Sequence, residues 1–285
     1  MSQEVKQQFS SWEDAVIWLR QQPDQTELVH DAYYDDPLIT VANRYWKSEE
    51  WGEVRFYLGS AKGAALDVGA GRGIASYALA KEGFAVSALE PDGSDLVGAG
   101  AIRQLANESK LNIHVVQELS ESLPFDEGSF DVVFARAVLH HCNDLEAACR
   151  EFHRVLKPGG KLVVVREHVI SRRSDLEVFF QEHPLHKLYG GEYAYLLEEY
   201  TGALLSAGFQ INAILEPFDS VINFAPYTEC SLKDELIDKL GIPKSLRKAP
   251  RSILNAPRFW SLVRKVLSMV DHRPGRLYSF VCERK

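Results

Sequence analysis

The chain has 285 residues, of which 46% are hydrophobic and 25% are charged. These fractions are close to those of an average soluble globular protein, so the composition excludes wholesale disorder. The 32 basic and 40 acidic residues give a formal net charge of −8, which provides no overall attraction to nucleic acid. Two domains would fit this length, but we prefer one α/β core with additions.

The cysteines and the hydropathy pattern indicate the compartment. The 4 cysteines include no C-x-x-C pair, which argues against a disulfide framework and against a cysteine zinc site. No stretch approaches the roughly 18 uncharged apolar residues that a membrane-spanning helix needs. We therefore expect a cytoplasmic protein with reduced thiols and no transmembrane segment.

Residues 1–60 differ from the rest in carrying many aromatic side chains on segments with a helical pattern. We expect an N-terminal helical cap in which most of these rings are buried. The aromatic residues are Trp12, Trp18, Tyr33, Tyr34, Tyr45, Trp46, Trp51, Phe56 and Tyr57.

From residue 64 to residue 166, short apolar runs alternate with helical stretches, which is typical of a parallel sheet covered on both faces. The fold class is therefore α/β, with a core formed by residues 61–217 and 276–285. The predicted strands are Ala65–Val68, Ala85–Leu89, Ile113–Val116, Val132–Ala135, Lys161–Val165, Gln210–Glu216 and Leu277–Cys282. The predicted helices are Ile74–Lys81, Ser94–Ala106, Leu145–Val155 and Glu192–Ser206.

Residues 218–275 form a predicted helical insertion before the last strand. Between Pro243 and Arg276 it carries 9 basic residues against Asp271 alone. This charge can be a solvated helical face, or the insertion can cover the ligand crevice. Apolar side chains interleaved with Arg264 and Lys265 would also suit a helix on an anionic membrane surface, although packing on the core is the simpler use. The basic residues are Lys244, Arg247, Lys248, Arg251, Arg258, Arg264, Lys265, Arg273 and Arg276.

The strongest motif is a glycine-rich turn between a predicted strand and a predicted helix, Leu66-Asp67-Val68-Gly69-Ala70-Gly71-Arg72-Gly73. Glycine permits positive φ and lets backbone N–H groups approach a ligand at a helix N-terminus. Glu90 ends the next strand, 21 residues after Gly69, where a carboxylate accepts hydrogen bonds from ribose hydroxyls. Together these features indicate a cofactor that contains adenosine.

The glycine spacing helps to choose between adenosine cofactors. A nicotinamide site typically has the pattern G-x-G-x-x-G, whereas this loop reads D-x-G-x-G-x-G. A carboxylate at Asp67 would repel a pyrophosphate and would suit a ligand with an ammonium group. A nicotinamide dehydrogenase is therefore a weaker alternative.

Four further segments follow in order, Leu123-Pro124-Phe125, Ser129-Phe130-Asp131-Val132-Val133, His140-His141 and Val155-Leu156-Lys157-Pro158-Gly159-Gly160-Lys161. With them, residues 62–166 resemble the class I S-adenosylmethionine-dependent methyltransferases, specifically the type 11 group that includes the ubiquinone and menaquinone biosynthesis C-methyltransferases. The resemblance implies a Rossmann-like, doubly wound sheet of seven strands with the last strand antiparallel, and S-adenosyl-L-methionine as the cofactor. The Lys157–Gly160 segment alone is most simply a turn.

The resemblance also implies roles for cofactor-binding residues. It assigns the loop from Gly69 through Ala70 and Gly71 to Gly73 to the methionine portion, Asp67 to the ammonium region and Glu90 to the ribose. The family usually has an acidic residue before Leu-Pro-Phe that holds the adenine. This chain has Gln117-Glu118-Leu119-Ser120 there, so Glu118 or the backbone must do that work.

Methyl transfer from a sulfonium is an in-line displacement that needs an aligned nucleophile and sometimes a base. The crevice of an open parallel sheet lies at the carboxyl ends of the strands, which nominates residues after the fourth and fifth predicted strands. His141 is our preferred base, with His140 and Glu167 as further catalytic candidates; packing or capping is the alternative use of the two histidines. Arg136 is assigned to the cofactor.

A second polar segment, together with His168, is expected to bind a polyhydroxylated substrate. A zinc site at His183, His186 and Glu192 is disfavoured because His-x-x-His on a loop with proline and glycine lacks the helical i, i+4 geometry, so no metal is predicted. Tyr33, Tyr34, Tyr45 and Trp46 are candidates for closing the cofactor pocket. The predicted substrate-binding residues are His168, His183, His186, Tyr189, Glu192 and Tyr193.

These observations predict a methyltransferase that acts on a small-molecule acceptor. Oxygen is the preferred atom, because the crevice is rich in histidine and the position of the Asn- or Asp-Pro-Pro-Tyr motif of many amine-methylating enzymes reads Ala135-Arg136-Ala137-Val138. The basic insertion favours an acidic acceptor, such as a phosphate- or carboxylate-bearing sugar or lipid-linked intermediate. The alternative is a regulatory or assembly protein that binds S-adenosylmethionine or S-adenosylhomocysteine without turnover.

Overall fold

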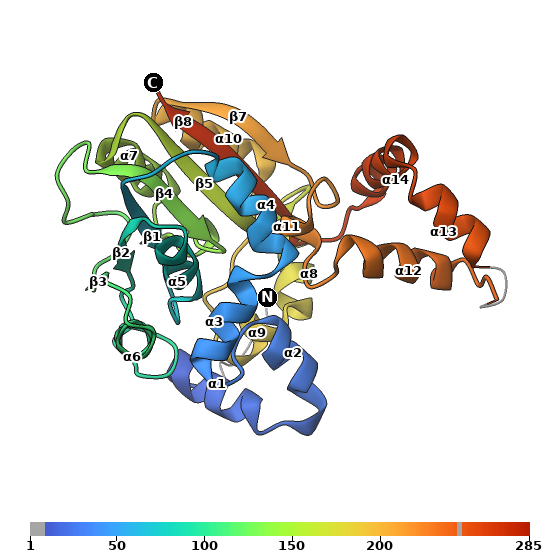
Figure 1. Ribbon diagram of the computed structural model, residues 1–285, viewed down its shortest axis with the longest axis horizontal. Helices are drawn as coiled ribbons and strands as arrows, with labels where there is room; N and C mark the ends of the chain where they lie inside the picture. Colours follow the sequence, from blue (N-terminus) through green and yellow to red (C-terminus); the bar gives the residue numbers. More distant parts are fainter. Residues whose placement is uncertain (1–8, 244–246) are drawn as a thin grey trace.

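The computed structural model describes residues 9–243 and 247–285. Its centre is an eight-stranded sheet in the order β3-β2-β1-β4-β5-β8-β7, with β6 paired to β5, and helices lie on both sides of it (Figure 1). β1 to β5 run parallel to their neighbours, while β8 is antiparallel to both β5 and β7. The strands are β1 (Ala64–Val68), β2 (Ala85–Leu89), β3 (Ile113–Val116), β4 (Phe130–Arg136), β5 (Leu156–Ile170), β6 (Tyr195–Leu196), β7 (Phe209–Leu215) and β8 (Arg276–Arg284).

This architecture confirms the predicted Rossmann-like α/β fold with an antiparallel last strand. The seven predicted strands are present, and β6 is an additional strand of 2 residues. Two short 3-10 turns, η1 (Pro23–Gln25) and η2 (Leu139–His141), accompany the helices. The helices are α1 (Trp12–Arg20), α2 (Thr26–Asp31), α3 (Leu38–Trp46), α4 (Glu49–Leu58), α5 (Ile74–Lys81), α6 (Ala99–Ser109), α7 (Leu145–Val155), α8 (Asp175–Glu182), α9 (Pro184–Leu188), α10 (Leu197–Ser206), α11 (Val221–Phe224), α12 (Glu229–Lys239), α13 (Lys248–Leu254) and α14 (Pro257–Val270).

The central strands β1, β4 and β5 bury both of their faces, because side chains alternate along a strand and helices cover both sides of the sheet. In β4, for example, Val132 and Phe134 face a core shared with α3, α4, α5, α6 and α11. Val133 and Ala135 face a second core, which α7 and α10 cover. The near-continuous apolar runs of the parallel strands follow from this double coverage.

Two helices begin later than the sequence pattern predicts. The helix predicted from Ser94 begins at Ala99, because the backbone N–H of Ser94 donates to the Asp92 carboxylate and the Ser94 hydroxyl accepts from Val97. Such local side-chain bonds compete with helix formation. The helix predicted from Glu192 begins at Leu197, since the preceding two residues pair with β5 as β6.

The N-terminal residues divide between two places. α3 and α4 pack on the sheet, where Tyr45, Trp51, Val54 and Leu58 join the core that contains β1 and β4. α1 and α2 instead pack against α9, in a small cluster whose buried members are Ala15, Leu19, Val29 and Leu188.

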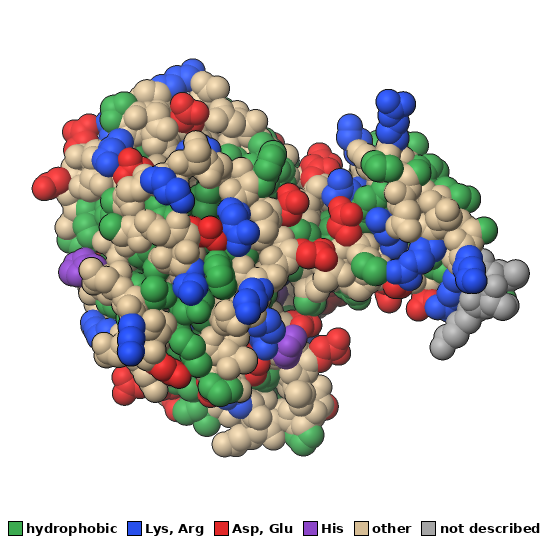
Figure 2. Space-filling model, viewed as in Figure 1, with side chains coloured by type: hydrophobic (Ala, Val, Ile, Leu, Met, Phe, Trp, Pro, Cys, Tyr) green, Lys and Arg blue, Asp and Glu red, His purple; other side chains and the backbone are tan. Residues whose placement is uncertain are grey.

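The described part of the predicted insertion is largely helical, and α12, α13 and α14 form an arm, residues 229–243 and 247–270, that projects from the body (Figures 1 and 2). Leu232, Ile237, Leu254 and Trp260 of the arm are buried in a small core together with Val221 and Phe224 of α11. Among the described residues, no helix is long and apolar enough to cross a membrane. The division of the chain into cap, core and insertion stays a prediction.

Candidate active site

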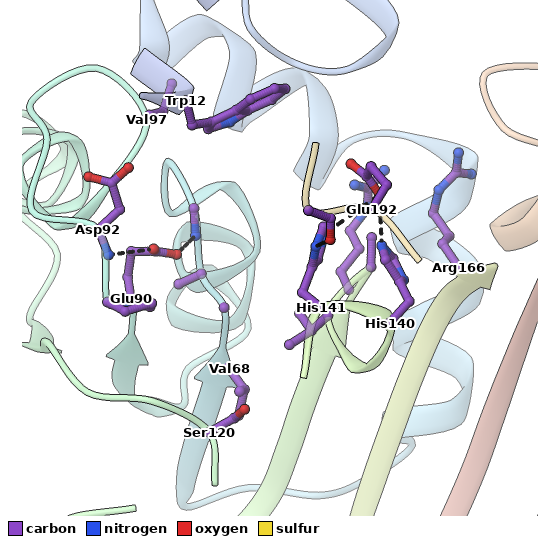
Figure 3. Close-up of a pocket in the computed structure, with 18 of the residues that line it drawn as sticks. Trp12, Val68, Glu90, Asp92, Val97, Ser120, His140, His141, Arg166 and Glu192 are labelled. Carbon is purple, nitrogen blue, oxygen red and sulfur yellow. Dashed lines mark hydrogen bonds and ion pairs between the residues drawn. The ribbon is translucent and has the colours of Figure 1, made fainter. Parts of the chain in front are cut away.

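A cavity of about 630 Å³ opens at the carboxyl ends of β1, β2, β4 and β5, which is the usual ligand position in an open parallel sheet. Figure 3 shows Glu90 at one side of this cavity and His140, His141 and Glu192 at the other. Trp12, Tyr33 and Tyr34 line it from the N-terminal segment, whereas Tyr45 and Trp46 do not line it. Two of the four predicted closing aromatics therefore reach the cavity.

The glycine loop has the backbone that its sequence requires, because Gly69, Gly71 and Gly73 have φ of 58°, 53° and 80°. A Cβ at Gly71 would meet no atom closer than the Val97 carbonyl oxygen at 4.0 Å, so the loop presents bare backbone to the cavity there. Gly73 does not line the cavity; a Cβ there would lie 3.1 Å from Ile102 of α6. The structure therefore gives Gly73 a packing role and not the predicted cofactor contact.

Asp67 and Glu90 both line the cavity and are both buried. The Ser76 hydroxyl donates to Asp67 Oδ2 at 2.5 Å, yet burial still raises the pKa of Asp67 to about 7. Glu90 accepts the backbone N–H of Gly71 at 2.6 Å and that of Asp92 at 3.0 Å. Burial raises the pKa of Glu90, and these two hydrogen bonds oppose the rise.

Two other predicted cofactor residues line the cavity with different surroundings. Glu118 is exposed at the rim. Arg136 is held by the buried Glu50, 2.7 Å from Nε to Oε1, and its guanidinium lies over the rings of Tyr33 and Tyr45. One buried carboxylate already neutralises this cation. Arg136 therefore supports the cavity wall and offers little unpaired charge to a ligand.

Glu167 holds the turn that carries His140, one of our catalytic candidates. Its fully buried carboxylate accepts the backbone N–H groups of Val138, Leu139 and His140 at 3.0–3.1 Å and also contacts His140 Nδ1 at 2.7 Å. Glu167 does not line the cavity. We predicted a catalytic role for Glu167, but its burial beneath the turn makes it a positioning residue.

Three histidines turn the same nitrogen toward Glu192. The Nε2 atoms of His140, His141 and His168 lie 3.2, 3.7 and 4.0 Å from Glu192 Oε2. On the opposite side of each ring, His141 Nδ1 lies 2.9 Å from the Gly191 carbonyl oxygen and His168 Nδ1 lies 2.8 Å from that of Gly275. His140 is almost fully buried, whereas the side chain of His141 is 44% exposed.

Charge and burial set the protonation of this cluster. Burial alone would lower the pKa of His140, but Glu167 and Glu192 outweigh burial and raise it to about 9. Burial and the neighbouring His140 lower the pKa of His141. Burial would raise the pKa of Glu192, but the hydrogen bond from His140 and the nearby His141 hold it well below its usual range.

The second polar segment reaches the cavity only in part. His183, Tyr189 and Glu192 line it, as does His168 of β5. His186 and Tyr193, which we predicted to bind substrate, do not line it: the His186 ring stacks on Phe180 at 4.4 Å, and the Tyr193 hydroxyl lies 3.3 Å from Arg173. The helix α9, which begins at Pro184, explains the position of His186, because Leu185 and Tyr189 share the helix face that lines the cavity and His186 does not.

Arg166 follows the fifth predicted strand, where we expected crevice residues, but we assigned it no role. β5 has a register shift against β8 between Val164 and Glu167, and Arg166 has a φ of 64° within it. A bulge of this kind re-aims a side chain, and Arg166 lines the cavity beside the histidine cluster (Figure 3). Its Nη1 donates to the carbonyls of Ile222 and Ala225, and no carboxylate among the described residues pairs with it.

A role of the basic insertion as a lid or substrate-recognition element stays a prediction. None of the described residues in 218–275 lines the cavity. In the arm, Arg247 pairs with Asp238, Arg251 with Asp234 and Arg264 with Glu229, so acidic neighbours neutralise much of the predicted positive charge. Lys244 lies outside the described residues.

Residues 66–164 match the type 11 methyltransferase family, described as "Methyltransferase domain". The chain is 30% identical over 139 residues to demethylmenaquinone methyltransferase of Chlorobaculum tepidum, covering 48% of this chain and 54% of that protein. It is 30% identical over 141 residues to ubiquinone biosynthesis O-methyltransferase of Xanthomonas oryzae pv. oryzae, covering 45% and 57%. The chain thus spans only about half the length of these curated relatives.

Among solved structures, a geranyl diphosphate C-methyltransferase from Streptomyces coelicolor superposes on this chain with a TM-score of 0.59. The superposition covers 96% of this chain and 97% of that chain at 15% identity. At this identity, the likeness shows a shared fold.

Proposed function

We propose that this chain, which carries a class I S-adenosylmethionine-dependent methyltransferase domain of the type 11 group, methylates an oxygen atom of a small acidic or polyhydroxylated molecule. The family match over residues 66–164 confirms the predicted resemblance and supports the predicted enzyme class. S-adenosylmethionine is the cofactor of this domain, and the solved Streptomyces coelicolor enzyme was crystallised with S-adenosylhomocysteine. The oxygen preference has support from the O-methyltransferase among the relatives.

One observation carries the proposal. A single cavity holds the glycine loop, Asp67 and Glu90 at one side and the histidine cluster with Arg166 at the other (Figure 3). A cofactor whose ribose contacts Glu90 and whose ammonium group contacts Asp67 would extend its methyl group toward the second side. The acceptor therefore belongs near His141, His183 and Arg166.

The reaction needs an acceptor oxygen that gives up its proton and attacks the methyl carbon. The new C–O bond forms as the C–S bond breaks, and the electron pair returns to sulfur to leave S-adenosylhomocysteine. His141 is the candidate base, since its side chain is partly exposed in the cavity and the Gly191 carbonyl can only accept a hydrogen bond from Nδ1. Neutral His141 therefore carries a lone pair at Nε2, on the side of the ring that faces Glu192.

The acidic character of the acceptor has support from two side chains. Arg166 presents a guanidinium without a carboxylate partner among the described residues, which suits an anionic group in a cavity of low dielectric. His183 Nδ1 accepts the backbone N–H of His186 at 3.2 Å, so neutral His183 must carry its proton at Nε2 as a donor for acceptor oxygens.

The first experiment is incubation of the chain with labelled S-adenosylmethionine and a library of carboxylated phenols, sugar acids and matched amines. Transfer to hydroxyl acceptors is the expected result, and transfer to amines alone would refute the oxygen preference. A binding protein without turnover would instead be thermally stabilised by the cofactor and would form no S-adenosylhomocysteine with any acceptor.

His141→Ala is the second experiment. We expect turnover to fall by roughly 10² to 10⁴ while S-adenosylhomocysteine affinity stays nearly intact, which is the usual effect of removing a general base. Arg166→Gln should instead raise the Michaelis constant for an acidic acceptor more than it lowers turnover. A loss in turnover below about tenfold for His141→Ala would remove that residue from proton transfer.

The proposal includes contact with an anionic membrane surface through the arm. α14 exposes the apolar side chains of Phe259, Leu262, Val266 and Met269 at helical spacing. The predicted stripe packs only in part. Trp260 is buried and Val263 packs beside it, whereas Phe259, Leu262, Val266 and Val270 of the same stripe are exposed. The exposed stripe, flanked by Arg258 and Lys265, suits adsorption of the arm to a lipid surface that carries the acceptor.

A further inference from the structure

The histidine cluster has the donor geometry of a metal centre. One nitrogen each from His140 and His168 and one oxygen of Glu192 all lie within 4.8 Å of one another. Donors around a four-coordinate transition metal, with bonds of about 2.0–2.2 Å, are separated by about 3.4 Å along each edge of the tetrahedron. The two Nε2 atoms lie 3.2 and 4.0 Å from Glu192 Oε2, so small rotations of these side chains would complete such a set.

The hydrogen bonds on the far sides of the rings aim lone pairs at this point. A carbonyl oxygen can only accept, so His168 Nδ1 carries a proton toward Gly275, and neutral His168 has a bare Nε2. The Glu167 carboxylate accepts hydrogen bonds from three backbone N–H groups. It also accepts from His140 Nδ1, so that nitrogen carries a proton. Without the proton that His140 Nε2 shares with Glu192, two Nε2 lone pairs face one anionic oxygen, so the space between them holds either that proton or a metal ion.

Two features favour a metal ion over a shared proton. Glu167 is fully buried and Glu192 nearly so, and two carboxylates this close to the same imidazole carry twice the charge of one imidazolium. Moreover, ligating histidines usually donate their second N–H to a carboxylate or a backbone carbonyl. His140 does so to Glu167, and His168 does so to Gly275.

We propose that His140, His168 and Glu192 bind one divalent transition-metal ion, with Glu167 as the positioning residue that orients His140. Two imidazoles and a carboxylate suit Zn²⁺, Fe²⁺ or Co²⁺ better than Mg²⁺, which prefers oxygen donors. Three protein ligands leave at least one coordination position open. All three ligands line the cavity, so the open position faces the acceptor region.

The open coordination position gives the proposed function a more specific acceptor class, and this part of the inference rests on the proposed function. An acceptor hydroxyl or carboxylate bound there would have its oxygen fixed beside His141, and the ion would favour loss of the hydroxyl proton. The metal site thus specifies an acceptor class, namely molecules with a hydroxyl group next to a second oxygen donor that can bind the same ion.

The test measures metal binding without turnover. The purified chain is stripped with a chelator and titrated with Zn²⁺ by calorimetry, and metal content is measured after dialysis; Co²⁺ serves as a visible-absorption probe. We expect one ion per wild-type chain. Glu192→Gln and His168→Gln should each weaken binding by at least about a hundredfold, and Glu167→Gln by about 10- to 100-fold, as outer-shell changes do.

His186→Gln is the matched control, because His186 lies in the same polar segment but stacks on Phe180 outside the cavity. It should bind Zn²⁺ like the wild type. Substoichiometric binding by the wild type, or the same affinity in Glu192→Gln and His186→Gln, would overturn the metal site. Calorimetry with S-adenosylhomocysteine on each variant reports whether the variant is folded, and it keeps the two proposals separate. If the wild type binds cofactor but no metal, only the metal site is refuted. If it binds metal but no cofactor, the proposed function is refuted.

Discussion

Glu90 has two tasks in this structure, although its sequence position indicates only one. Its carboxylate holds the backbone N–H of Gly71, at 2.6 Å, as well as facing the expected ribose. Glu90→Ala should therefore weaken S-adenosylhomocysteine binding by at least about tenfold, because charge-assisted hydrogen bonds are each worth roughly 1.5–3 kcal/mol. It should also lower the melting temperature, since the loop loses its anchor.

Glu90→Gln keeps part of the anchor, because its single amide oxygen can accept from Gly71 while its nitrogen cannot accept from Asp92, and the charge is lost. We expect a melting temperature and a cofactor affinity that both lie between those of the wild type and Glu90→Ala. Calorimetric titration and thermal unfolding measure both effects. Equal cofactor affinity in all three proteins would remove Glu90 from the binding site.

The buried Asp67 makes a prediction for pH. Its pKa of about 7 means that the ligand-free protein binds a proton there below neutrality. The Ser76 hydroxyl, Glu90 and Arg136 are the groups that act on it. An ammonium group favours the ionised carboxylate, so binding below pH 7 must release that proton. Affinity for S-adenosylhomocysteine should be about tenfold weaker at pH 6 than at pH 8 and level above pH 8.

Calorimetry in two buffers of different ionisation enthalpy measures the released proton directly. Asp67→Asn should bind more weakly and with no pH dependence over this range. Glu90→Gln should keep the pH dependence, which assigns it to Asp67. A wild-type affinity that does not change between pH 6 and pH 8 would contradict contact between Asp67 and the ammonium group.

The residues that sequence analysis could place are those whose role depends on local chain geometry. Asp67, Gly71 and Glu90 lie within one strand–loop–helix unit, so their spacing in sequence fixes their spacing in space. Glu167 is different, because the turn that it holds lies 27 to 29 residues earlier in the chain. Arg166 enters the cavity through a bulge formed against β8, which is more than a hundred residues away in sequence.

At the scale of elements, amphipathic periodicity predicted α7 well and the loop helices poorly. Leu145, Ala148, Cys149, Phe152 and Val155 recur at helical spacing, all five are buried, and Asp144 caps the first turn by accepting from Ala147. The bounds of α7 therefore agree with the prediction. β6 has only 2 residues and forms because β5 is long enough to offer a partner, which no local pattern indicates.

The arm yields a prediction that belongs to one helix. Leu262 and Met269 of α14 are 57% and 72% exposed, on a stripe flanked by basic residues. We expect the chain to bind vesicles that contain anionic lipid, with binding lost at high salt because surface electrostatics are screened. Leu262→Glu and Met269→Glu should each weaken binding by about tenfold or more, since burial of such a side chain is worth roughly 1.5–3 kcal/mol.

Leu205→Glu provides the control in a vesicle-sedimentation assay. Leu205 is 59% exposed, but it lies on α10 in the body of the molecule. Its substitution should leave vesicle binding unchanged. Equal binding by the wild type, Leu262→Glu and Met269→Glu would show that α14 does not contact the lipid.

At the scale of the whole molecule, the N-terminal helices are tied to the cofactor loop, and the arm is not. The buried Arg72 guanidinium of the glycine loop donates to the backbone carbonyls of Tyr33, Asp35 and Leu96 and pairs with Asp36 at 2.6 Å. Because these bonds cross from the loop to the N-terminal segment, an ordered loop and an ordered N-terminal segment stabilise each other. The arm instead packs around a small core that it shares with α11.

This asymmetry predicts which parts of the molecule respond to the cofactor. S-adenosylhomocysteine should slow amide hydrogen exchange in α1 to α4 as well as in the glycine loop, because Trp12, Tyr33 and Tyr34 line the same cavity and a ligand at 100 times its dissociation constant adds about 2.7 kcal/mol to stability. Exchange in α12 to α14 should not change, since no described residue of the arm lines the cavity.

In Arg72→Gln, the ligand should still slow exchange in the glycine loop but should slow it much less in α1 and α2. The reason is that the hydrogen bonds that transmit the effect are gone. Exchange mass spectrometry with and without ligand makes the comparison, and uniform protection that includes the arm, or none in the N-terminal helices, would contradict the coupling.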